Sequence, residues 1–226
     1  MQWSLVIPVK ALARAKSRLT DTTGDEVRPG LALAFAQDTV AATLACPEVR
    51  DVAVVTDDPL AGRELSVLGA VIVPDEPAGG LNAALAHGAG VVRSRRPGAA
   101  VAALNADLPA LRPAELGRVL RAATAFPRSF LADAAGIGTT LLAAGPGREL
   151  RPAFGVDSRR RHLASGAVEL ATRSVDSVRQ DVDTGDDLRA ALALGAGART
   201  VAAVEASAWG ASAPGASPSM CGNRGY

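Results

Sequence analysis

Positively charged residues are concentrated directly after the first apolar run of the sequence. The segment IPVKALARAKSRL carries four of them, at Lys10, Arg14, Lys16 and Arg18. In an open α/β sheet, the loop that follows a strand borders the ligand crevice, and Lys and Arg side chains placed there bind phosphate oxygens. The segment therefore predicts a polyphosphate site. The alternative is a solvated basic loop, because runs of charge are usually exposed.

Two aspartates are placed to bind a divalent cation. Asp107, in LNADLPAL, follows an apolar run, and Asp183, in DVDTGDDL, precedes a predicted helix. Mg²⁺ prefers one or two carboxylates, completed by substrate phosphates and water. We therefore expect a Mg²⁺ site if the two side chains meet in space. Each also has a local alternative: Asp107 can cap the turn before Pro109, and Asp183 can cap the helix.

A glycine- and hydroxyl-rich stretch, GIGTTLLAAGPGRELRPAFGVDSRRRH, is suited to binding a small anion. We expect Ser158 to cap a short helix and Gly155 to let the backbone approach a phosphate or carboxylate closely. A hairpin followed by a capped helix would explain the glycine and the serine without a ligand. It would explain the three consecutive arginines less readily. The hydroxyl and glycine residues offered here are Thr139, Thr140, Gly155 and Ser158.

A weaker signal lies in DEPAGGLNAALAHGAG, where a glycine pair precedes a predicted helix. Such a turn lets Gly80 and Asn82 reach a nucleotide, although glycine before a helix is common without ligands. His87 and His162 are expected to be packing or surface residues, because no Cys or His stands at metal-binding spacing. The sequence also lacks a Walker motif and a G-x-G-x-x-G after its first strand.

Short apolar runs alternate with longer helical patterns, which predicts a Rossmann-like α/β fold with a mostly parallel central sheet and flanking helices. After Phe126 we expect a small β-rich insertion for the second substrate, built from a strand pair, a loop and a short helix. Thr184 is expected to cap a later helix. The predicted strands are 5–9, 52–56, 70–73, 100–104 and 200–204, and the predicted helices are 30–45, 59–68, 81–93 and 113–125.

Length and composition limit the class of protein. The 226 residues predict one domain over 1–205, and the Ala/Gly/Ser/Pro-rich end predicts a disordered tail over 206–226. A formal net charge of +1 gives no general attraction to nucleic acid or to an anionic membrane. No leader is recognised, and no run reaches the roughly 18 apolar residues of a membrane span. With two distant cysteines, we expect a cytoplasmic protein in a reducing compartment.

Taken in series, PVKALARAKSRL, GLNAAL, NADLP, GTTLLAA, FGVDSRRRH and DVDTGDDL resemble the phosphoenolpyruvate/2-phospho-L-lactate guanylyltransferase family of coenzyme F420 biosynthesis. The resemblance covers about residues 2–205 and implies a nucleotidyltransferase fold. One departure is Ala106, where related enzymes commonly have glycine. The implied roles are phosphoenolpyruvate binding by Thr140, Gly155 and Ser158, contact with GTP phosphates and catalysis by Lys10, Lys16 and Arg18, and Mg²⁺ binding by Asp107 and Asp183.

The reaction that this resemblance implies is transfer of GMP from GTP to phosphoenolpyruvate, with release of pyrophosphate. The acceptor phosphate is already ionised near neutral pH, so no general base is required. A downstream transferase is an expected partner for the unstable product. The acceptor could equally be 2-phospho-L-lactate or 3-phosphoglycerate. The sequence is also compatible with a molybdopterin or cytidylyl transferase, and with a non-catalytic nucleotide-binding module if Asp107 and Asp183 lie too far apart to share a cation.

Overall fold

The first half of the chain alternates strands with helices, as its apolar pattern predicts. The structure is a computed structural model that describes residues 1–12, 27–76 and 78–212. Neighbouring strands of this half pair in parallel. The strands are β1 (Trp3–Pro8), β2 (Val49–Val55), β3 (Val71–Val73) and β4 (Ala100–Leu104), and the helices are α2 (Arg28–Leu44), α3 (Pro59–Val67), α4 (Leu81–Arg95) and α5 (Pro113–Ala123).

The second half adds three strands to the same sheet. These are β5 (Arg128–Ala132), β6 (Thr139–Ala144) and β7 (Val168–Glu169), and the sheet order is β3-β2-β1-β4-β6-β5-β7. Strand β6 runs antiparallel to both of its neighbours, so the expected strand pair continues the central sheet. The remaining helices are α6 (Ser158–Ala164), α7 (Asp176–Arg179), α8 (Gly185–Leu194) and α9 (Ala198–Ser212).

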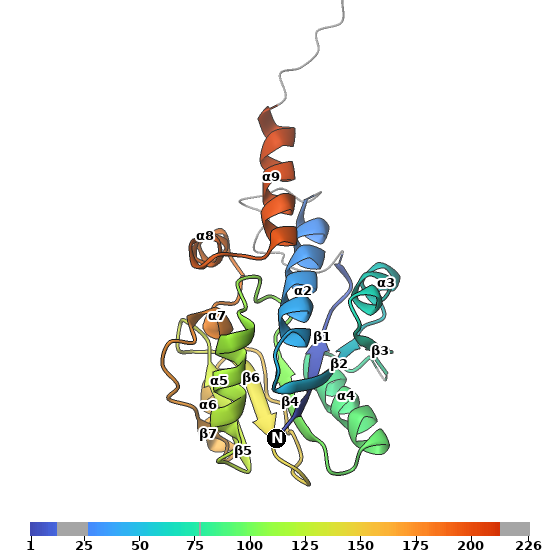
Figure 1. Cartoon of the computed structure of the whole chain (residues 1–226), viewed down its shortest axis with the longest axis vertical. Helices are drawn as coiled ribbons and strands as arrows, with labels where there is room; N and C mark the ends of the chain where they lie inside the picture. Colours follow the sequence, from blue (N-terminus) through green and yellow to red (C-terminus); the bar gives the residue numbers. More distant parts are fainter. Residues whose placement is uncertain (13–26, 77, 213–226) are drawn as a thin grey trace, which may run out of the picture.

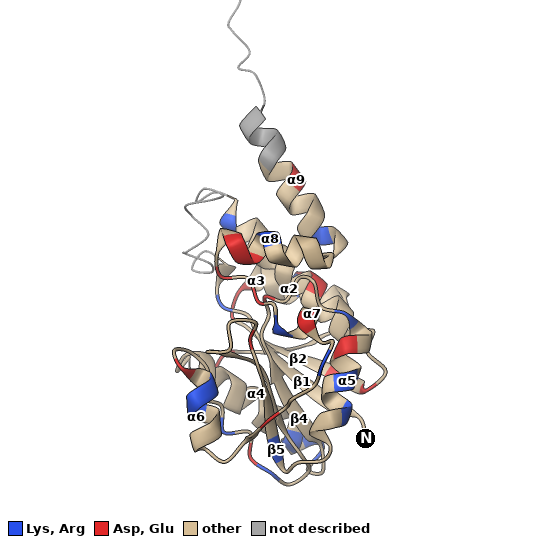
Figure 2. Cartoon of the chain, turned by 90° about the vertical axis from the view of Figure 1, so that its left-hand side faces the viewer, with Lys and Arg blue, Asp and Glu red and all other residues tan. Residues whose placement is uncertain are grey.

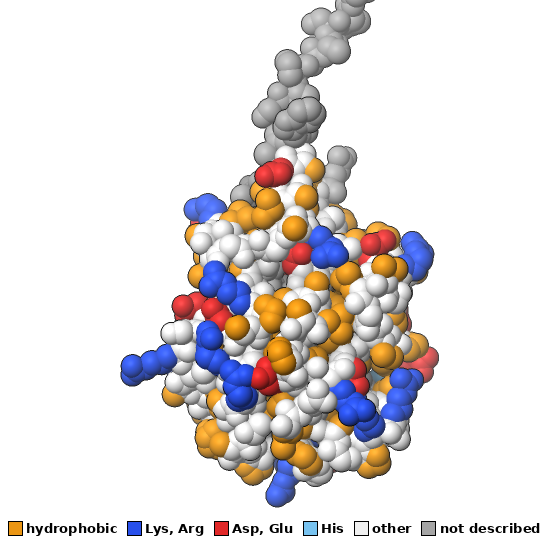
Figure 3. Space-filling model, in the orientation of Figure 1, with side chains coloured by type: hydrophobic (Ala, Val, Ile, Leu, Met, Phe, Trp, Pro, Cys, Tyr) orange, Lys and Arg blue, Asp and Glu red, His pale blue; other side chains and the backbone are white. Residues whose placement is uncertain are grey.

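Alternate residues of the central strands pack against two helical layers (Figure 1). Leu5 and Ile7 of β1 contact the layer formed by α2, α3 and α5, whereas Val6 belongs to the cluster that includes α4. All three side chains are fully buried. Because both faces of the sheet are covered, its central strands β1 and β4 are almost entirely apolar. On the face shown in Figure 3, positive and negative side chains are interspersed.

The expected strand at 200–204 is wrong, because these residues lie in α9. The carboxylate of Asp38, on α2, accepts hydrogen bonds from the amides of Arg199 (3.4 Å) and Thr200 (2.8 Å). A buried acid at this position satisfies amides that a helix N-terminus leaves without partners. Residues 206–212, expected to open the tail, also lie in α9, and 213–226 are outside the described residues. The domain boundary at 205/206 stays a prediction.

Strand β7 and helix α7 were not predicted, because each is too short to show a periodic pattern. The other predicted strands and helices occur, with ends shifted by a few residues at most. Among the described helices, none is both long and apolar enough for a membrane crossing.

The contact between α4 and the sheet depends on Gly88. A Cβ atom built there would lie 2.6 Å from a methyl group of Val6 and 2.7 Å from one of Val55. We expect Gly88→Ala to lower the free energy of unfolding by about 1 to 3 kcal/mol, because two buried strands must move. Chemical denaturation monitored by circular dichroism measures this change.

Gly90 provides the matched control in the same helix. It is exposed, and a Cβ atom there would meet nothing within 4 Å. Gly90→Ala is expected to raise the free energy of unfolding by about 0.5 to 1 kcal/mol through helix propensity. Equal effects of the two substitutions would contradict the proposed packing.

Candidate active site

A cavity of about 750 Å³ opens at the carboxyl ends of β1 and β4. In open α/β sheets this is the edge at which ligands bind. Its lining includes six residues that the sequence singled out for chemistry, namely Lys10, Asp107, Thr139, Gly155, Ser158 and Asp183. The phosphate, metal and acceptor segments therefore meet at one cavity.

The loop that carries Asp107 is fixed by α2. The fully buried Thr39 hydroxyl donates to the carbonyl of Ala106 and accepts from the amide of Leu108, each at 3.1 Å. The carbonyl of Asp107 accepts from the amide of Val182 at 3.0 Å. This last bond brings the DVDTGDDL segment to the end of β4.

Three carboxylates line this end of the cavity: Asp107, Asp181 and Asp183. The sequence analysis assigned no role to Asp181, whose carboxylate accepts from the Asn105 amide group at 3.4 Å. The sequence could have indicated Asp181 through its spacing, because it stands one residue before Val182, which is buried, and two before Asp183. Helix α8 is capped by Thr184, so the capping alternative for Asp183 is wrong.

The donor set at this end suits a hard divalent cation, because it consists of carboxylate and amide oxygens. Within the described residues, no three His, Cys, Asp or Glu side chains converge closely enough to form a metal site by themselves. A cation held by Asp107 and Asp183 would need substrate phosphates and water to complete its coordination, which is the arrangement that Mg²⁺ favours.

The start of the basic loop is tied to α3. The amide of Leu12 donates to the Asp58 carboxylate at 2.9 Å, and the same carboxylate caps α3 through Leu60 and Ala61. Partial burial opposes ionisation of Asp58, but these amides outweigh it and lower its pKa. Lys10 is exposed and lines the cavity. The other cations of the loop, Arg14, Lys16 and Arg18, lie outside the described residues.

The Phe154–Ser158 loop forms the opposite wall of the cavity. Asn82 does not line the cavity, because its side chain is bonded to the Phe154 backbone at both the amide (2.8 Å) and the carbonyl (3.1 Å). Gly80 begins α4 and is also outside the lining. Gly155 has a φ of +106°, which favours glycine. Ser158 is buried and is the first residue of α6, so Asp157 and not Ser158 occupies the cap position.

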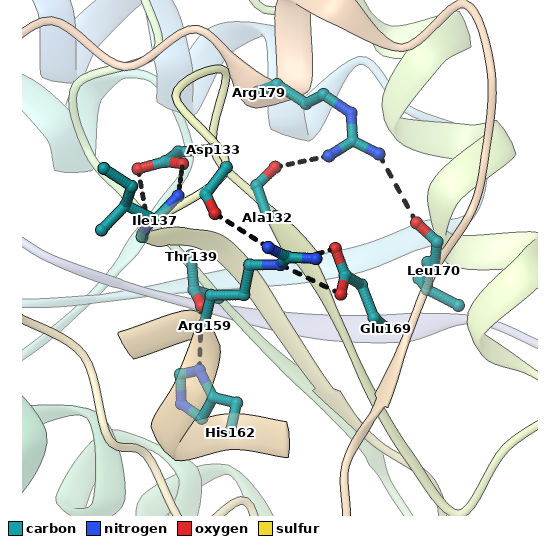
Figure 4. Close-up of polar contacts among 11 residues, drawn as sticks. Ala132, Asp133, Ile137, Thr139, Arg159, His162, Glu169, Leu170 and Arg179 are labelled. Carbon is teal, nitrogen blue, oxygen red and sulfur yellow. Dashed lines mark hydrogen bonds and ion pairs between the residues drawn. The ribbon is translucent and has the colours of Figure 1, made fainter. Parts of the chain in front are cut away.

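The arginine run that follows forms the blue stretch of α6 in Figure 2, and its members have structural partners. Arg159 pairs with Glu169 at 3.0 Å and donates to the carbonyl of Gly136 at 3.1 Å (Figure 4). Arg161 donates to the carbonyl of Phe154 at 3.0 Å. The exposed Arg160 pairs with Asp157 at 3.4 Å. None of the three lines the cavity, so the run orients the loop and the turn beside it.

A β-bulge places the two threonines that start β6, Thr139 and Thr140, in different environments. The register with β5 pairs Leu131 with Leu141 and Ala132 with Thr139, which leaves Thr140 as the extra residue. Bulges commonly re-aim side chains next to active sites. Thr139 lines the cavity, whereas Thr140 is fully buried behind it and is bonded through its carbonyl to the amide of Asn105 at 3.0 Å.

His162 is a packing residue, as expected, and its contacts make it central to this wall (Figure 4). It is fully buried, with its ring centroid 5.6 Å from that of Phe130 and 5.2 Å from that of Phe154. Burial, assisted by the nearby Arg128 and Arg161 guanidinium groups, lowers the pKa of His162 to about 4. The ring is therefore neutral at physiological pH.

The chain is similar to known guanylyl transferases. Residues 3–205 match the family model described as "Guanylyl transferase CofC like". A phosphoenolpyruvate guanylyltransferase of Streptomyces coelicolor is 77% identical over 202 residues, covering 89% of this chain and 95% of the relative.

Solved structures share the fold at low sequence identity. A nucleotidyl transferase of Methanothermobacter thermautotrophicus is 20% identical with a TM-score of 0.59, covering 85% of this chain and 97% of that one. A Mycobacterium tuberculosis H37Rv protein in complex with manganese is 21% identical with a TM-score of 0.52, covering 85% and 99%. These likenesses confirm the predicted nucleotidyltransferase fold.

The buried neutral state of His162 makes stability depend on pH. The unfolded chain binds a proton at this residue near its ordinary pKa of 6.5, whereas the folded protein resists protonation until about pH 4. The contribution is therefore present above pH 6.5 and is lost as the pH falls toward 4, by up to roughly 3 kcal/mol. Urea unfolding of the wild type and of His162→Gln across this range measures the difference.

We expect the wild type to be the more stable protein at neutral pH and its advantage to shrink on acidification. The carboxylates titrate in both proteins, so their contribution drops out of the difference between the two free energies of unfolding. Parallel stability curves would show that His162 does not resist protonation in the folded state.

Proposed function

The chain belongs to the CofC-like guanylyl transferase family, and we propose that it transfers GMP from GTP to phosphoenolpyruvate, giving enolpyruvyl-2-diphospho-5′-guanosine and pyrophosphate for coenzyme F420 biosynthesis. One structural observation carries the proposal: Asp107 and Asp183 line the same cavity as Gly155 and Ser158. A nucleotide phosphate site and a small-anion site then share one space. This supports an enzyme over a non-catalytic nucleotide-binding module.

The reaction forms a bond between two anions, with the attacking oxygen and the leaving oxygen on opposite sides of the α-phosphorus. A phosphate oxygen of phosphoenolpyruvate forms a bond to the α-phosphorus of GTP while the bond from that phosphorus to the bridging oxygen of the β-phosphate breaks. Pyrophosphate leaves with the bonding electrons. The attacking oxygen carries no proton at neutral pH, so the site must supply orientation and charge stabilisation only.

One wall of the cavity is proposed to hold the nucleotide phosphates and the cation, and the other wall is proposed to hold the acceptor. Lys10 is positioned to neutralise GTP phosphates as pyrophosphate forms, and Lys16 and Arg18 are proposed to assist it. Asp107 and Asp183 would hold the divalent cation, with Asp181 beside them. When bound, Mg²⁺ offsets the mutual repulsion of the phosphates. The manganese complex of the mycobacterial protein supports a divalent cation, and Mg²⁺ is our proposal for this chain.

The acceptor is proposed to bind at the Phe154–Ser158 wall. Gly155 allows the backbone to approach the phosphoacid, and Ser158 lines the cavity beside it; Thr140, the third residue of the predicted set, is fully buried behind Thr139. Gly80 and Asn82, predicted to bind the nucleotide, lie outside the described lining of the cavity, and Asn82 instead holds the acceptor loop in place. We further propose a cytoplasmic location and transfer of the product to the downstream transferase.

Pyrophosphate release tests the function directly. Purified protein is incubated with GTP, Mg²⁺ and, separately, phosphoenolpyruvate, 2-phospho-L-lactate or 3-phosphoglycerate, with ATP and CTP as nucleotide controls and the product-capturing transferase present. We expect release that requires both GTP and phosphoenolpyruvate. Release with another of these acids would reassign the acceptor, and silence with every acid would reject the proposed reaction.

Removing one cavity carboxylate tests the metal assignment. We expect Asp107→Asn to lower kcat/KM by about a hundredfold or more, because an amide cannot replace the carboxylate charge on a hard cation. The control is Asp186→Asn, which removes an exposed carboxylate of α8 that pairs with Arg189 and lies outside the cavity lining. It should retain wild-type kinetics. Full turnover by Asp107→Asn would exclude the assignment.

A further inference from the structure

Thr139 and His162 are joined at the acceptor wall of the cavity. The Thr139 hydroxyl lies 2.9 Å from Nδ1 of His162, and the two residues come from β6 and α6 (Figure 4). Thr139 is 4% exposed and lines the cavity, whereas His162 is fully buried behind it. The pair therefore connects the interior of the protein to the space where the acceptor is proposed to bind.

The second nitrogen of the ring determines the direction of this hydrogen bond. The amide of Ala153 donates to Nε2 of His162 at 3.0 Å. A backbone amide can only donate, so Nε2 carries a lone pair and the proton of the neutral ring is on Nδ1. Nδ1 must then donate to the Thr139 oxygen. Protonation of the ring would place two donors against each other at Nε2.

A hydroxyl that accepts from His162 keeps its own proton available. The bond to His162 is the only hydrogen bond that Thr139 Oγ1 makes with the described residues. Because one hydroxyl supplies one donor and two acceptor lone pairs, its proton is free to be donated to an anion in the cavity. The β-bulge at Thr140 gives Thr139 this orientation, which the regular alternation of a strand would not predict.

We propose that Thr139 is an acceptor-binding residue whose hydroxyl donates to an anionic oxygen of the phosphoacid, and that His162 is the positioning residue that orients this hydroxyl. The inference rests on the proposed function. It differs from the assignment of Thr140, whose side chain is fully buried and whose hydroxyl has no hydrogen-bond partner in the described chain.

Two substitutions at Thr139 test the hydroxyl. Thr139→Val preserves the shape of the side chain and removes the donor, so we expect the KM for phosphoenolpyruvate to rise roughly ten- to hundredfold, as expected for a lost hydrogen bond to a charged group. The KM for GTP should stay within about twofold of the wild-type value. Thr139→Ser keeps the hydroxyl and should restore most of the acceptor affinity.

Two substitutions at His162 separate its two hydrogen bonds. The side-chain amide of Asn reaches the position of Nδ1, so His162→Asn can still donate to Thr139 but loses the bond from Ala153. The amide of Gln reaches the position of Nε2, so His162→Gln keeps the Ala153 bond and loses the orientation of Thr139. We expect His162→Gln to show the larger rise in acceptor KM and to add little to Thr139→Val in the double variant.

The outcomes are distinguishable. Wild-type turnover together with an acceptor KM for Thr139→Val within about twofold of wild type would overturn the inference and leave the proposed function intact. Equal acceptor KM values for the two His162 variants would overturn the positioning role. A wild type that is silent with every phosphoacid would reject the proposed function and the inference with it. Should Thr139→Val not fold, as judged by circular dichroism, Thr139→Ala is measured in its place.

Discussion

The candidate active site depends on one backbone hydrogen bond, from the amide of Val182 to the carbonyl of Asp107. It joins two acidic segments that are far apart in the sequence. Val182 is fully buried between them, so Asp181 and Asp183 on either side of it reach the cavity. Without this bond the carboxylates would belong to separate loops. The capping box of Thr184 and Asp187 directly afterwards starts α8 and fixes the path of the chain as it leaves.

Carboxylates dominate the charged residues in the part of the cavity lining that the structure describes. The described lining contains five aspartates and a single cation, Lys10. Asp133 is satisfied locally, because its carboxylate accepts from the amides of Ile137 (2.9 Å) and Gly138 (2.8 Å). Asp157 pairs with Arg160. Asp107, Asp181 and Asp183 line the part of the cavity proposed to hold the phosphates, where a bound divalent cation would offset the repulsion between the two anionic substrates.

Local patterns in the sequence predicted most of the fold and the acidic part of the site. The strand at 100–104 occurs with the predicted ends, because a short apolar run flanked by turn residues is read locally. The run at 200–204 was ambiguous between strand and helix, and Asp38 of a distant helix decides it. Asn82 and the arginine run looked like ligand contacts, because their backbone partners at Phe154 and Gly136 are brought close only by the fold. Thr139 was named together with Thr140 as an anion-binding candidate, but the sequence could not separate the two, since a bulge cannot be read from one strand alone.

The two walls of the cavity are built by different means, and this fits a reaction that needs no proton transfer. The wall at β4 and Val182 carries several carboxylates, whereas the backbone of the wall at Phe154 is held by hydrogen bonds to the neutral side chains of Asn82 and His162 and by one from Arg161. His162 has both nitrogens engaged and a lowered pKa, so it is unsuited to act as a base. A fixed neutral ring instead keeps the loop and the Thr139 hydroxyl in one arrangement across the physiological pH range. Catalysis by positioning requires this constancy, because the acceptor oxygen must be aligned with the α-phosphorus before any bond changes.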